Sequence, residues 1–429
     1  MLVQNAEAEA RKKAMQSSSS HYSLFTFLPK DTRHLYCLLI TAVACFLLFL
    51  LSFSPSSPSP LRSSSSSAAD GLGSSPLPAP PSFAYLLSGS TNDADRLIRL
   101  VLASYHPKNL YLLHLDLAAP QEQRDRLARD IHAVPAFRSS RNVHVLGRAD
   151  FANPRGSSAL ASTIHGAAVL LRLSGRWDWF VNLGADDYPL VTQDDLLHVF
   201  SFLPKDLNFV QHSSYVGWRE SRMLKHVIVD PGLYLSSKAD VFYATQKRDV
   251  PNAYRIFTGS SSVILSRKFV EHIILGTDNL PRALLMYYTN SPSSHKNYLQ
   301  TVLCNSPEFS RTIVNDHLHY LRSGPPSKQD LNLLLLEDLN NMTLSGAAFG
   351  SNFYRDDPVL DQIDKKVLNR GPRMTVPGGW CLDRGNSDPC RVWGNPDALI
   401  PGPGATRLAR NVVKLLTNES FQSRRCAWD

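Results

Sequence analysis

Acidic side chains stand at the ends of several predicted strands, where they could bind a polar ligand. Asp116 ends the apolar run LYLLHLD, and Asp187 follows the run WDWFVNL. Ser88 lies in the Ser-Gly-Ser turn after an earlier run of this kind. Ligands of open α/β sheets bind outside the carboxyl ends of the strands. We therefore predict that Ser88 and Asp116 hold a nucleotide and that Asp187 lies beside it. The alternative for each Asp is a helix cap or a turn.

A D-x-D pattern occurs at Asp93-Ala-Asp95, and this spacing of carboxylates could hold Mn²⁺ or Mg²⁺. The pair opens a predicted helix, where acidic residues suit the N-terminal dipole, so we favour a capping interpretation. Basic side chains could then neutralise a diphosphate in place of a metal. The candidates, each alternatively a solvated surface charge, are Arg219, Arg222, Lys225, Lys365, Lys366 and Arg370.

Residues 218–222, Trp-Arg-Glu-Ser-Arg, combine one aromatic ring with several charges. Such a ring can stack on the C–H face of a sugar, while the charges bind hydroxyls and carboxylates. The alternative is the start of a surface helix.

The order of apolar runs predicts an α/β fold with a mostly parallel sheet, because strands alternate with helices of ten or more residues. The second half is less regular, and the Pro/Gly/Asn-rich chain after residue 322 suggests long loops that close over a site. The predicted strands are 83–87, 110–116, 142–146, 177–183, 208–211, 256–259 and 262–265. One predicted helix contains residues 97–102. The others span 120–132, 158–173, 194–202, 268–275 and 297–304.

Residues 35–53 form an uncharged run of nineteen residues, long enough to span a bilayer as a helix. More basic residues precede it than follow it, which places residues 1–34 in the cytosol. Residues 54–82 are a Ser/Pro-rich stem, and 83–429 form the globular lumenal domain. A buried core helix is the alternative for the run. The net charge of +8 suits an anionic substrate, and no nucleic-acid-binding motif accompanies it.

Four cysteines lie in the predicted lumenal part, and none has the C-x-x-C spacing of a zinc site. They are Cys304, Cys381, Cys390 and Cys426. Four cysteines allow three pairings, of which Cys381 with Cys390 is the easiest local bridge. Asn341 and Asn418 each begin a sequon for N-glycosylation.

Nine stretches, in order from residue 83 almost to the end, together resemble glycosyltransferase family 14, the core-2/I-branching enzyme family. The resemblance is closest to the plant β-glucuronosyltransferases that act on arabinogalactan proteins. The stretches are FAYLLSGS, LYLLHLD, DWFVNLGADDYPLVTQDDLL, IVDPGLYLS, FTGSSSVILSRKFVEH, DNLPRALLMYYTN, VNDHLHY, DDPVLDQID and GNPDALIPGPGATRL.

This resemblance implies a GT-A-like fold, a UDP-sugar donor, inversion at the anomeric carbon and no required metal or other cofactor. It also implies a Golgi type II membrane protein that transfers glucuronic acid from UDP-glucuronic acid to β-galactan. Trp218, Glu220, Arg222 and Lys225 would then face the acceptor or the donor carboxylate. UDP-N-acetylglucosamine is the alternative donor. Association into a homo-oligomer, or with other Golgi transferases, is a further expectation.

The sequence departs from the family pattern in its catalytic half. Lys296 stands where the resemblance implies a Glu that acts as general base, and Phe349-Gly-Ser-Asn-Phe353 lacks the implied Arg-Lys pair. Residues 322–326, Arg-Ser-Gly-Pro-Pro, replace a Trp-Asp-Asn-Pro-Pro run. Three explanations remain: another base (His295, Glu220 or Glu308), a different acceptor, or an inactive family member that binds sugars or partner transferases.

Overall fold

The computed structural model describes residues 78–234, 240–322, 332–383 and 388–417, together with Phe421 and Cys426. The predicted cytosolic tail, the apolar run 35–53, most of the stem and the sequon at Asn418 lie outside these residues. Among the residues that are described, no helix has the length and apolar character needed to cross a membrane.

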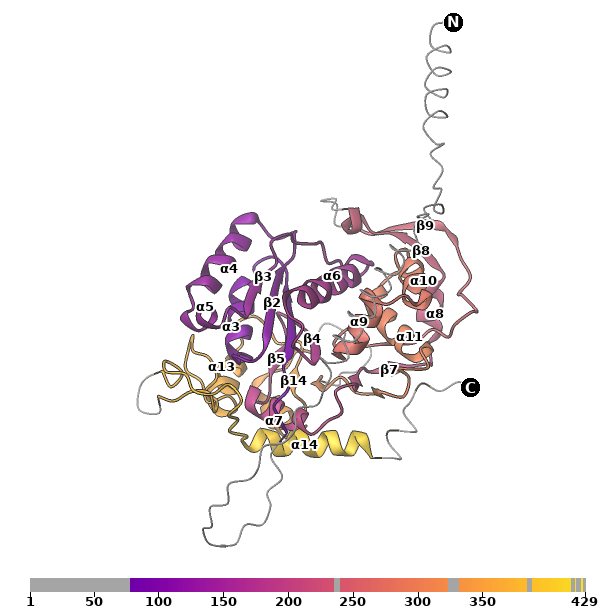
Figure 1. The fold of residues 1–429 in the computed structure, drawn as a ribbon. Helices are drawn as coiled ribbons and strands as arrows, with labels where there is room; N and C mark the ends of the chain where they lie inside the picture. The colour runs from indigo at the N-terminus through magenta and orange to yellow at the C-terminus, as the bar shows by residue number, and fades with distance from the viewer. Residues whose placement is uncertain are drawn as a thin grey trace, which may run out of the picture. The chain divides into compact units, whose positions relative to one another are not determined.

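A seven-stranded sheet forms the centre of the fold (Figure 1). Its strand order is β12-β6-β11-β4-β1-β2-β3, and all neighbours run parallel except β11, which is antiparallel to both β4 and β6. The predicted mostly parallel sheet is therefore confirmed. The strands are β1 (Phe83–Gly89), β2 (Leu110–Leu115), β3 (Val143–Val145), β4 (Trp179–Gly184), β6 (Asn208–Phe209), β11 (Ile264–Ser266) and β12 (Ile313–Val314).

Helices cover both faces of this sheet, which explains why the central strands are almost continuously apolar. Phe83, Tyr85 and Leu87 of β1 point to one layer, and Ala84 and Leu86 point to the other. The first layer contains α3 (Ala94–Ala103), α4 (Gln121–Ala133), α5 (Pro135–Ser140) and α7 (Gln193–Ser201). The second contains α6 (Ser158–Leu173), α9 (Arg267–Leu275), α10 (Asn279–Tyr288) and α11 (Tyr298–Asn305).

Helix α6 has the predicted bounds and packs closely on the sheet. Gly166 faces Leu86 of β1 so closely that a Cβ atom at Gly166 would come within 2.6 Å of the Leu86 side chain. At the start of the helix, Asp230 accepts hydrogen bonds from the backbone N–H groups of Ser157 and Ser158, each at 2.8 Å. This contact satisfies donors that no helical carbonyl can reach.

Three small sheets surround the main one. In the first, β14 (Phe349–Gly350) pairs with β5 (Tyr188–Pro189) and β13 (His319–Tyr320), which brings a late segment beside Asp187. The second pairs β7 (His212–Ser213) with β10 (Thr258–Gly259), so only part of the predicted strand 256–259 forms. The third pairs β8 (His226–Val229) with β9 (Phe242–Lys247). The short helices α8 (Trp218–Leu224) and η1 (Pro231–Tyr234) flank β8 along the chain.

The chain after residue 322 is more helical than the prediction of long loops. It contains η4 (Leu336–Asp338), α12 (Leu339–Leu344), α13 (Pro358–Lys366) and α14 (Pro403–Leu416). Both longer helices begin at a proline, which is favoured at the first helical position, so the Pro/Gly content marks helix starts here. Leu408, Val412 and Leu415 form the buried face of α14.

Two side chains of α7 anchor this C-terminal segment. Asp194 accepts hydrogen bonds from the N–H groups of Gly379 and Ile400, both at 2.7 Å, and Asp195 accepts one from Gly402 at 2.6 Å. Figure 1 shows α14 beside α7 at the lower edge of the fold.

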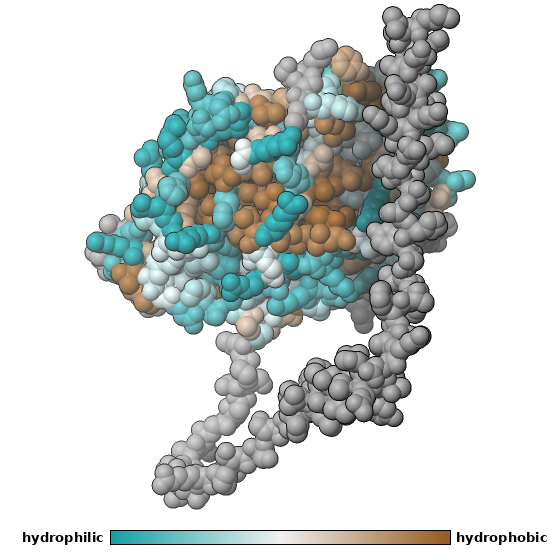
Figure 2. Space-filling view, turned by 45° about the horizontal axis from the view of Figure 1, so that its top comes forward, coloured by the Kyte–Doolittle hydropathy of each residue, from teal (hydrophilic) through white to brown (hydrophobic). Residues whose placement is uncertain are grey.

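Figure 2 shows a broad hydrophobic area, bordered by hydrophilic side chains, on one face of the molecule. Apolar burial is thus incomplete even though the two core layers are well filled.

Candidate functional site

Two adjoining pockets lie at the carboxyl ends of β1 and β4. They share Ser88, Gly184 and Asp186, together with Ala152 and Pro154 of the loop before α6. We call one the Asp116 pocket (about 760 Å³) and the other the serine-lined pocket (about 740 Å³), after Ser260–Ser262 in its wall. Each volume falls in the usual range for small-ligand sites.

The Asp116 pocket contains two of the predicted nucleotide contacts, Ser88 at the end of β1 and Asp116 after β2. Asp116 is buried, and its carboxylate accepts hydrogen bonds from the N–H groups of Ala118 at 2.6 Å and Ala152 at 2.7 Å. It therefore joins the loop after β2 to the loop before α6. Asp116 therefore has the turn-forming role of the alternative interpretation, and it also lies in the wall of the pocket.

The two carboxylates of the D-x-D pattern do not converge. Asp93 occupies the N-cap position of α3 and accepts a hydrogen bond from the N–H of Ser90 at 2.9 Å. It also pairs with Arg355 at 3.0 Å. Asp95 is exposed and pairs with Arg126 at 2.8 Å. The predicted position at the helix start is confirmed, although Asp93 bonds to the preceding turn and not to the N–H groups of its own helix.

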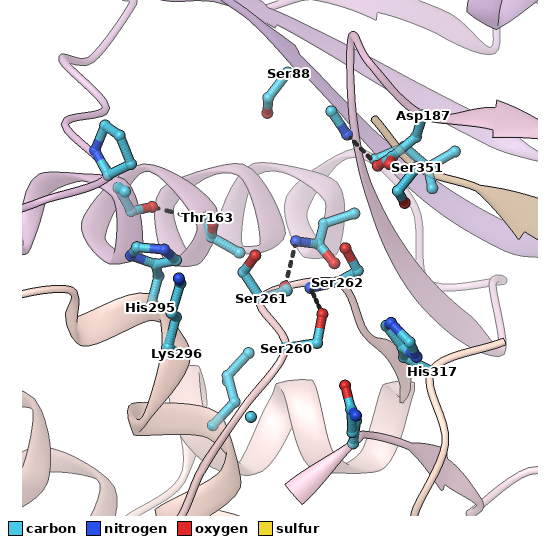
Figure 3. A pocket seen from close by; sticks show the side chains of 18 of the residues that line it. Ser88, Thr163, Asp187, Ser260, Ser261, Ser262, His295, Lys296, His317 and Ser351 are labelled. Carbon is cyan, nitrogen blue, oxygen red and sulfur yellow. Dashed lines mark hydrogen bonds between the residues drawn. The ribbon is translucent and has the colours of Figure 1, made fainter. Parts of the chain in front are cut away.

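Asp187 lies in the wall of the serine-lined pocket (Figure 3) and is almost completely buried. Its carboxylate accepts a hydrogen bond from the N–H of Gly184 at 2.7 Å. Burial, together with the nearby charge of Asp186, raises the pKa of Asp187 to about 7. Asp186 is exposed at the junction of the two pockets. The two neighbouring carboxylates thus differ in environment.

His295 and Lys296 enter the serine-lined pocket from η2 (Ser294–Lys296). The hydroxyl of Ser294 donates to the carbonyls of Tyr288 and Ser291, at 2.5 and 2.7 Å, and so fixes this turn. Burial, reinforced by the charge of Lys296, lowers the pKa of His295 to about 4. The imidazole of His295 is therefore neutral at physiological pH, and among the described residues its buried Nδ1 has no hydrogen-bond partner.

The opposite wall comes from residues that sequence reasoning missed. Asn182 of β4 donates to the carbonyl of Ser261 at 2.9 Å and accepts from the N–H of Val263 at 2.9 Å, which shapes the loop before β11. His317 also lines this pocket and stacks on His319, with ring centroids 5.1 Å apart. The Gly-Ser-Ser-Ser run between two predicted strands was the available signal for this loop.

Several predicted site residues lie elsewhere and line neither pocket. Glu308 forms an ion pair with Lys268 at 2.6 Å and is 56% exposed, so its position disfavours a role as base. The exposed residues of α8 and its C-cap, namely Trp218, Glu220, Arg222 and Lys225, belong to a surface helix, as the alternative interpretation held. The guanidinium groups of Arg219 and Arg222 lie over the Trp218 ring.

The predicted diphosphate cations are also outside the pockets. Arg370 is buried in ion pairs with Asp364, at 2.6 and 3.0 Å, and bonds to the Tyr188 hydroxyl at 2.9 Å. Lys365 and Lys366 end α13. Ser351 and Asn352 of the segment 349–353 do reach the serine-lined pocket, but they carry no charge.

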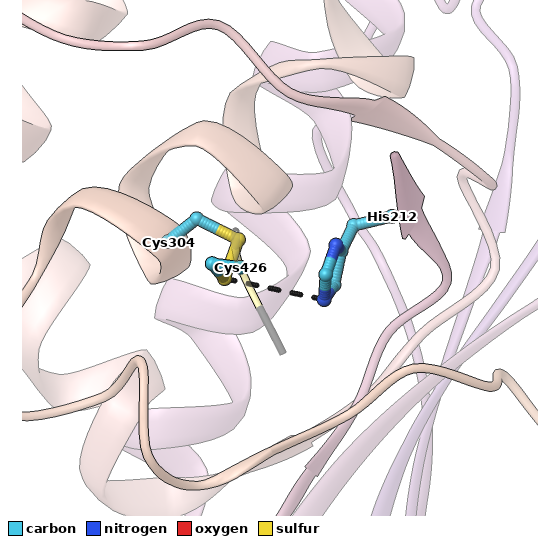
Figure 4. A group of neighbouring side chains, drawn as sticks. All are labelled: His212, Cys304 and Cys426. Carbon is cyan, nitrogen blue, oxygen red and sulfur yellow. Dashed lines mark hydrogen bonds between the residues drawn. A yellow bond between two sulfur atoms is a disulfide. The ribbon is translucent and has the colours of Figure 1, made fainter. Parts of the chain in front are cut away.

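Both disulfides are formed within the described part of the chain, and they settle the pairing as Cys381–Cys390 and Cys304–Cys426. His212 approaches Cys426, with Nε2 3.9 Å from Sγ (Figure 4). These three side chains have the proximity of a metal site. The two sulfurs are bonded to each other, however, so neither is a thiolate that could bind zinc. The other predicted modification site that is described, Asn341, is exposed on α12.

Comparison with known proteins gives one consistent result. A family model described as Core-2/I-Branching enzyme matches residues 83–343. The chain is 51% identical over 354 residues to Beta-glucuronosyltransferase GlcAT14A of Arabidopsis thaliana, covering 82% of this chain and 79% of that protein. It is 42% identical over 387 residues to Beta-glucuronosyltransferase GlcAT14C of the same plant, covering 90% and 96%. Human Xylosyltransferase 1 is 28% identical over 242 residues, covering 56% of this chain and 24% of that protein.

Proposed function

This chain belongs to the Core-2/I-branching enzyme family, and on that premise we propose that it is a β-glucuronosyltransferase. Its donor is UDP-glucuronic acid, and its acceptor is the β-galactan side chain of arabinogalactan-type proteoglycans. The observation that carries the proposal is the identity of 42–51% with three Arabidopsis proteins that bear the name beta-glucuronosyltransferase. A GT-A-like architecture is part of the same proposal and agrees with the mostly parallel sheet.

The two pockets provide room for the two halves of this donor. We assign the uridine to the Asp116 pocket, where Ser88 and the strand-terminal carboxylate can meet ribose hydroxyls or the base N–H. The transferred sugar and the acceptor hydroxyl then occupy the serine-lined pocket, whose wall offers many hydroxyl groups. Arg155 lines the Asp116 pocket and pairs only with the exposed Asp240 among its described ion pairs, so it is our candidate contact for the diphosphate.

Inversion requires an in-line attack by an acceptor hydroxyl on C1 of the sugar. As the new C1–O bond forms, the C1–O bond to the β-phosphate breaks, and its electron pair leaves with UDP. A general base must accept the hydroxyl proton at the same time. Among the three bases predicted from the sequence, His295 alone lines the pocket, and its low pKa keeps it unprotonated. We therefore assign it this role.

We propose that the transfer needs no metal ion. Asp93 and Asp95, the carboxylates of the D-x-D pattern, are engaged with Arg355 and Arg126, and only Asp93 lines the Asp116 pocket. Activity should accordingly survive an excess of EDTA, and loss of activity that Mn²⁺ or Mg²⁺ restores would contradict this point.

We further propose that the protein is a Golgi type II membrane protein anchored by residues 35–53, with its catalytic domain in the lumen. Two disulfides support an oxidising compartment, because disulfides rarely persist in the cytosol. Asn341, which begins a sequon, is exposed, and this is compatible with that location. Fluorescence microscopy of a tagged chain beside Golgi markers, and a mobility shift after N-glycan removal, would test this placement.

One observation favours a second candidate, a family member that binds sugars without transferring them. Lys296 extends into the serine-lined pocket, and a protonated lysine cannot act as a general base. The decisive experiment incubates the full-length chain, purified in detergent, with a β-galactan oligosaccharide and either UDP-glucuronic acid or UDP-N-acetylglucosamine. Mass spectrometry should detect a hexuronosyl product with the first donor only. A folded chain that binds UDP but forms neither product would favour the inactive candidate.

A further inference from the structure

We propose that Lys296 selects the donor by pairing its ammonium group with the C6 carboxylate of glucuronic acid. This assignment rests on the proposed function and deepens it. It replaces the sequence-based expectation that Arg222 and Lys225 meet this carboxylate, since those side chains line neither pocket.

The charge distribution of the serine-lined pocket is the first argument. Lys296 is the only Lys or Arg among the described residues that line it, and no ion pair of its side chain is found there. Figure 3 shows Lys296 beside His295, on the other side of the view from Asp187, and both residues line the pocket. Lys296 is an exposed residue, so the ammonium group is available to an incoming anion.

The rigidity of the backbone that carries Lys296 is the second argument. Ser293, which precedes η2, adopts a left-handed conformation with a φ of 48°. Its N–H donates to the carbonyl of Arg155 at 3.1 Å, and the N–H of Lys296 donates to the carbonyl of Ser293 at 3.1 Å. The turn is thus tied to the loop before α6, and the lysine is held at the pocket wall.

The position of Arg155 separates the two anionic parts of the donor. Arg155 lines the Asp116 pocket, whereas Lys296 lines the serine-lined pocket, and Pro154 borders both. A UDP-hexuronate carries negative charge on its diphosphate and again on the far side of the sugar ring. Two cations on tethered segments, one in each pocket, match these two groups.

Two acidic side chains of the serine-lined pocket explain why an ion pair between Lys296 and the glucuronate would discriminate between donors. Asp186 and Asp187 lie in the same pocket as Lys296, and a glucuronate entering it brings another carboxylate. Like charges within one pocket repel, and the ammonium group of Lys296 offsets the repulsion. UDP-glucose carries CH₂OH in place of the carboxylate, so it gains nothing from the ammonium charge.

The test compares the binding of UDP-glucuronic acid and UDP-glucose by calorimetry, using the full-length chain in detergent. The variants are Lys296→Gln, Lys296→Arg and the matched surface control Lys225→Gln. Lys296→Gln should weaken UDP-glucuronic acid binding about tenfold or more, because hydrogen bonds to charged groups contribute on that order. Its affinity for UDP-glucose should change less than about twofold. Lys296→Arg and Lys225→Gln should keep the wild-type preference.

Equal weakening for both donors would overturn the assignment, because Lys296 would then contact a part that they share, such as the diphosphate. An unchanged donor preference in Lys296→Gln would overturn the assignment as well. The thermal unfolding temperature of each variant serves as the control for correct folding. Transfer assays separate this inference from the proposed function. Wild-type transfer of glucuronic acid with an unchanged preference in Lys296→Gln rejects only the lysine assignment. Selective binding that depends on Lys296 but leads to no transfer rejects only the catalytic proposal.

Discussion

Among the single residues, His295 is the proposed general base. Replacing His295 by Gln removes the base but keeps a polar side chain of similar length. General-base catalysis contributes about 10²–10⁴-fold, so kcat/KM for glucuronosyl transfer should fall by that order. Calorimetry should show that UDP-glucuronic acid still binds. The exposed His132→Gln serves as the control, and a variant that keeps most of its activity would exclude His295 as the base.

The low pKa of His295 also predicts the shape of the pH profile. Its imidazole becomes protonated only near pH 4, because burial and Lys296 disfavour the charged form. The pH profile of kcat/KM should therefore show no step from the ionisation of His295 between about pH 5 and pH 8. A fall in kcat/KM around pH 6.5 that vanishes in His295→Gln would contradict the assignment of a buried, neutral base.

The raised pKa of Asp187 predicts how the free energy of unfolding depends on pH. Burial and Asp186 raise its pKa in the folded protein from 3.8 to about 7, so between these values the folded protein binds more protons than the unfolded chain. The free energy of unfolding should therefore decrease as the pH rises from about 4 to about 7. Asp187→Asn removes this ionisation while an amide oxygen can still accept from Gly184. Relative to wild type, the variant should gain a few kcal/mol between pH 5 and pH 8.

Urea unfolding of both proteins at pH 5 and pH 8 measures this difference. The exposed Asp95→Asn should show no comparable pH-dependent gain. A constant difference between Asp187→Asn and wild type at the two pH values would mean that Asp187 is ionised in the folded state throughout this range.

Among the elements, α13 is joined to β5 by a buried polar network. Asp364 of α13 pairs with Arg370 and Arg99 and accepts a hydrogen bond from the Tyr188 hydroxyl of β5 at 2.6 Å. Asp364→Ala leaves Arg370, whose side chain is 2% exposed, without the carboxylate that balances its charge. Breaking such a buried pair costs about 3–5 kcal/mol.

A control for Asp364→Ala exists on the same helix. Asp361 pairs with Arg99 at 2.7 Å but is 74% exposed, so Asp361→Ala should cost less than about 1 kcal/mol. Denaturant unfolding measures both values. Similar losses for the two variants would show that the buried network contributes no more than a surface ion pair.

Elements also show which parts of the site could be predicted. Ser88 lies at the end of β1, and Asp116 and Asp187 follow β2 and β4. Position at a strand end was enough to place all three at the pockets. His295 was predicted as a base because it lies next to Lys296, at the position where the family resemblance implies a Glu. The residues from Trp218 to Arg222 line neither pocket, because local composition does not tell which way a surface helix faces.

Long-range contacts explain the residues that the sequence did not reveal. Ser260–Ser262 reach the site because Asn182 of β4 bonds to their loop. Ser351 reaches it because β14 pairs with β5, and these strands are far apart in the sequence. Likewise, the anchoring of Gly379, Ile400 and Gly402 by α7 turns a Pro/Gly-rich tail into ordered structure. Neither kind of contact has a local signature.

The two disulfides differ in how much of the whole molecule they constrain. Cys304–Cys426 closes a loop with a sequence separation of 122, whereas Cys381–Cys390 spans 9. Loop-closure entropy then predicts stabilisation of about 5 and about 2.5 kcal/mol, respectively. Paired Cys→Ser variants should show this order in urea unfolding at neutral pH. A larger loss from the short bridge would mean that its local contacts, such as the hydrogen bond from Trp393 to the Cys390 carbonyl, outweigh the entropy term.

At the same scale, the central claim is that the molecule is an inverting glucuronosyltransferase. The most direct test is an NMR time course of the full-length chain with UDP-glucuronic acid and a β-galactan oligosaccharide. The donor carries its sugar in the α configuration, so inversion predicts that the first product signal is the anomeric proton of a β-linked glucuronosyl residue. An α-linked product would contradict inversion. The absence of any glucuronosylated product, from a chain that is folded and binds the donor, would contradict the transferase itself.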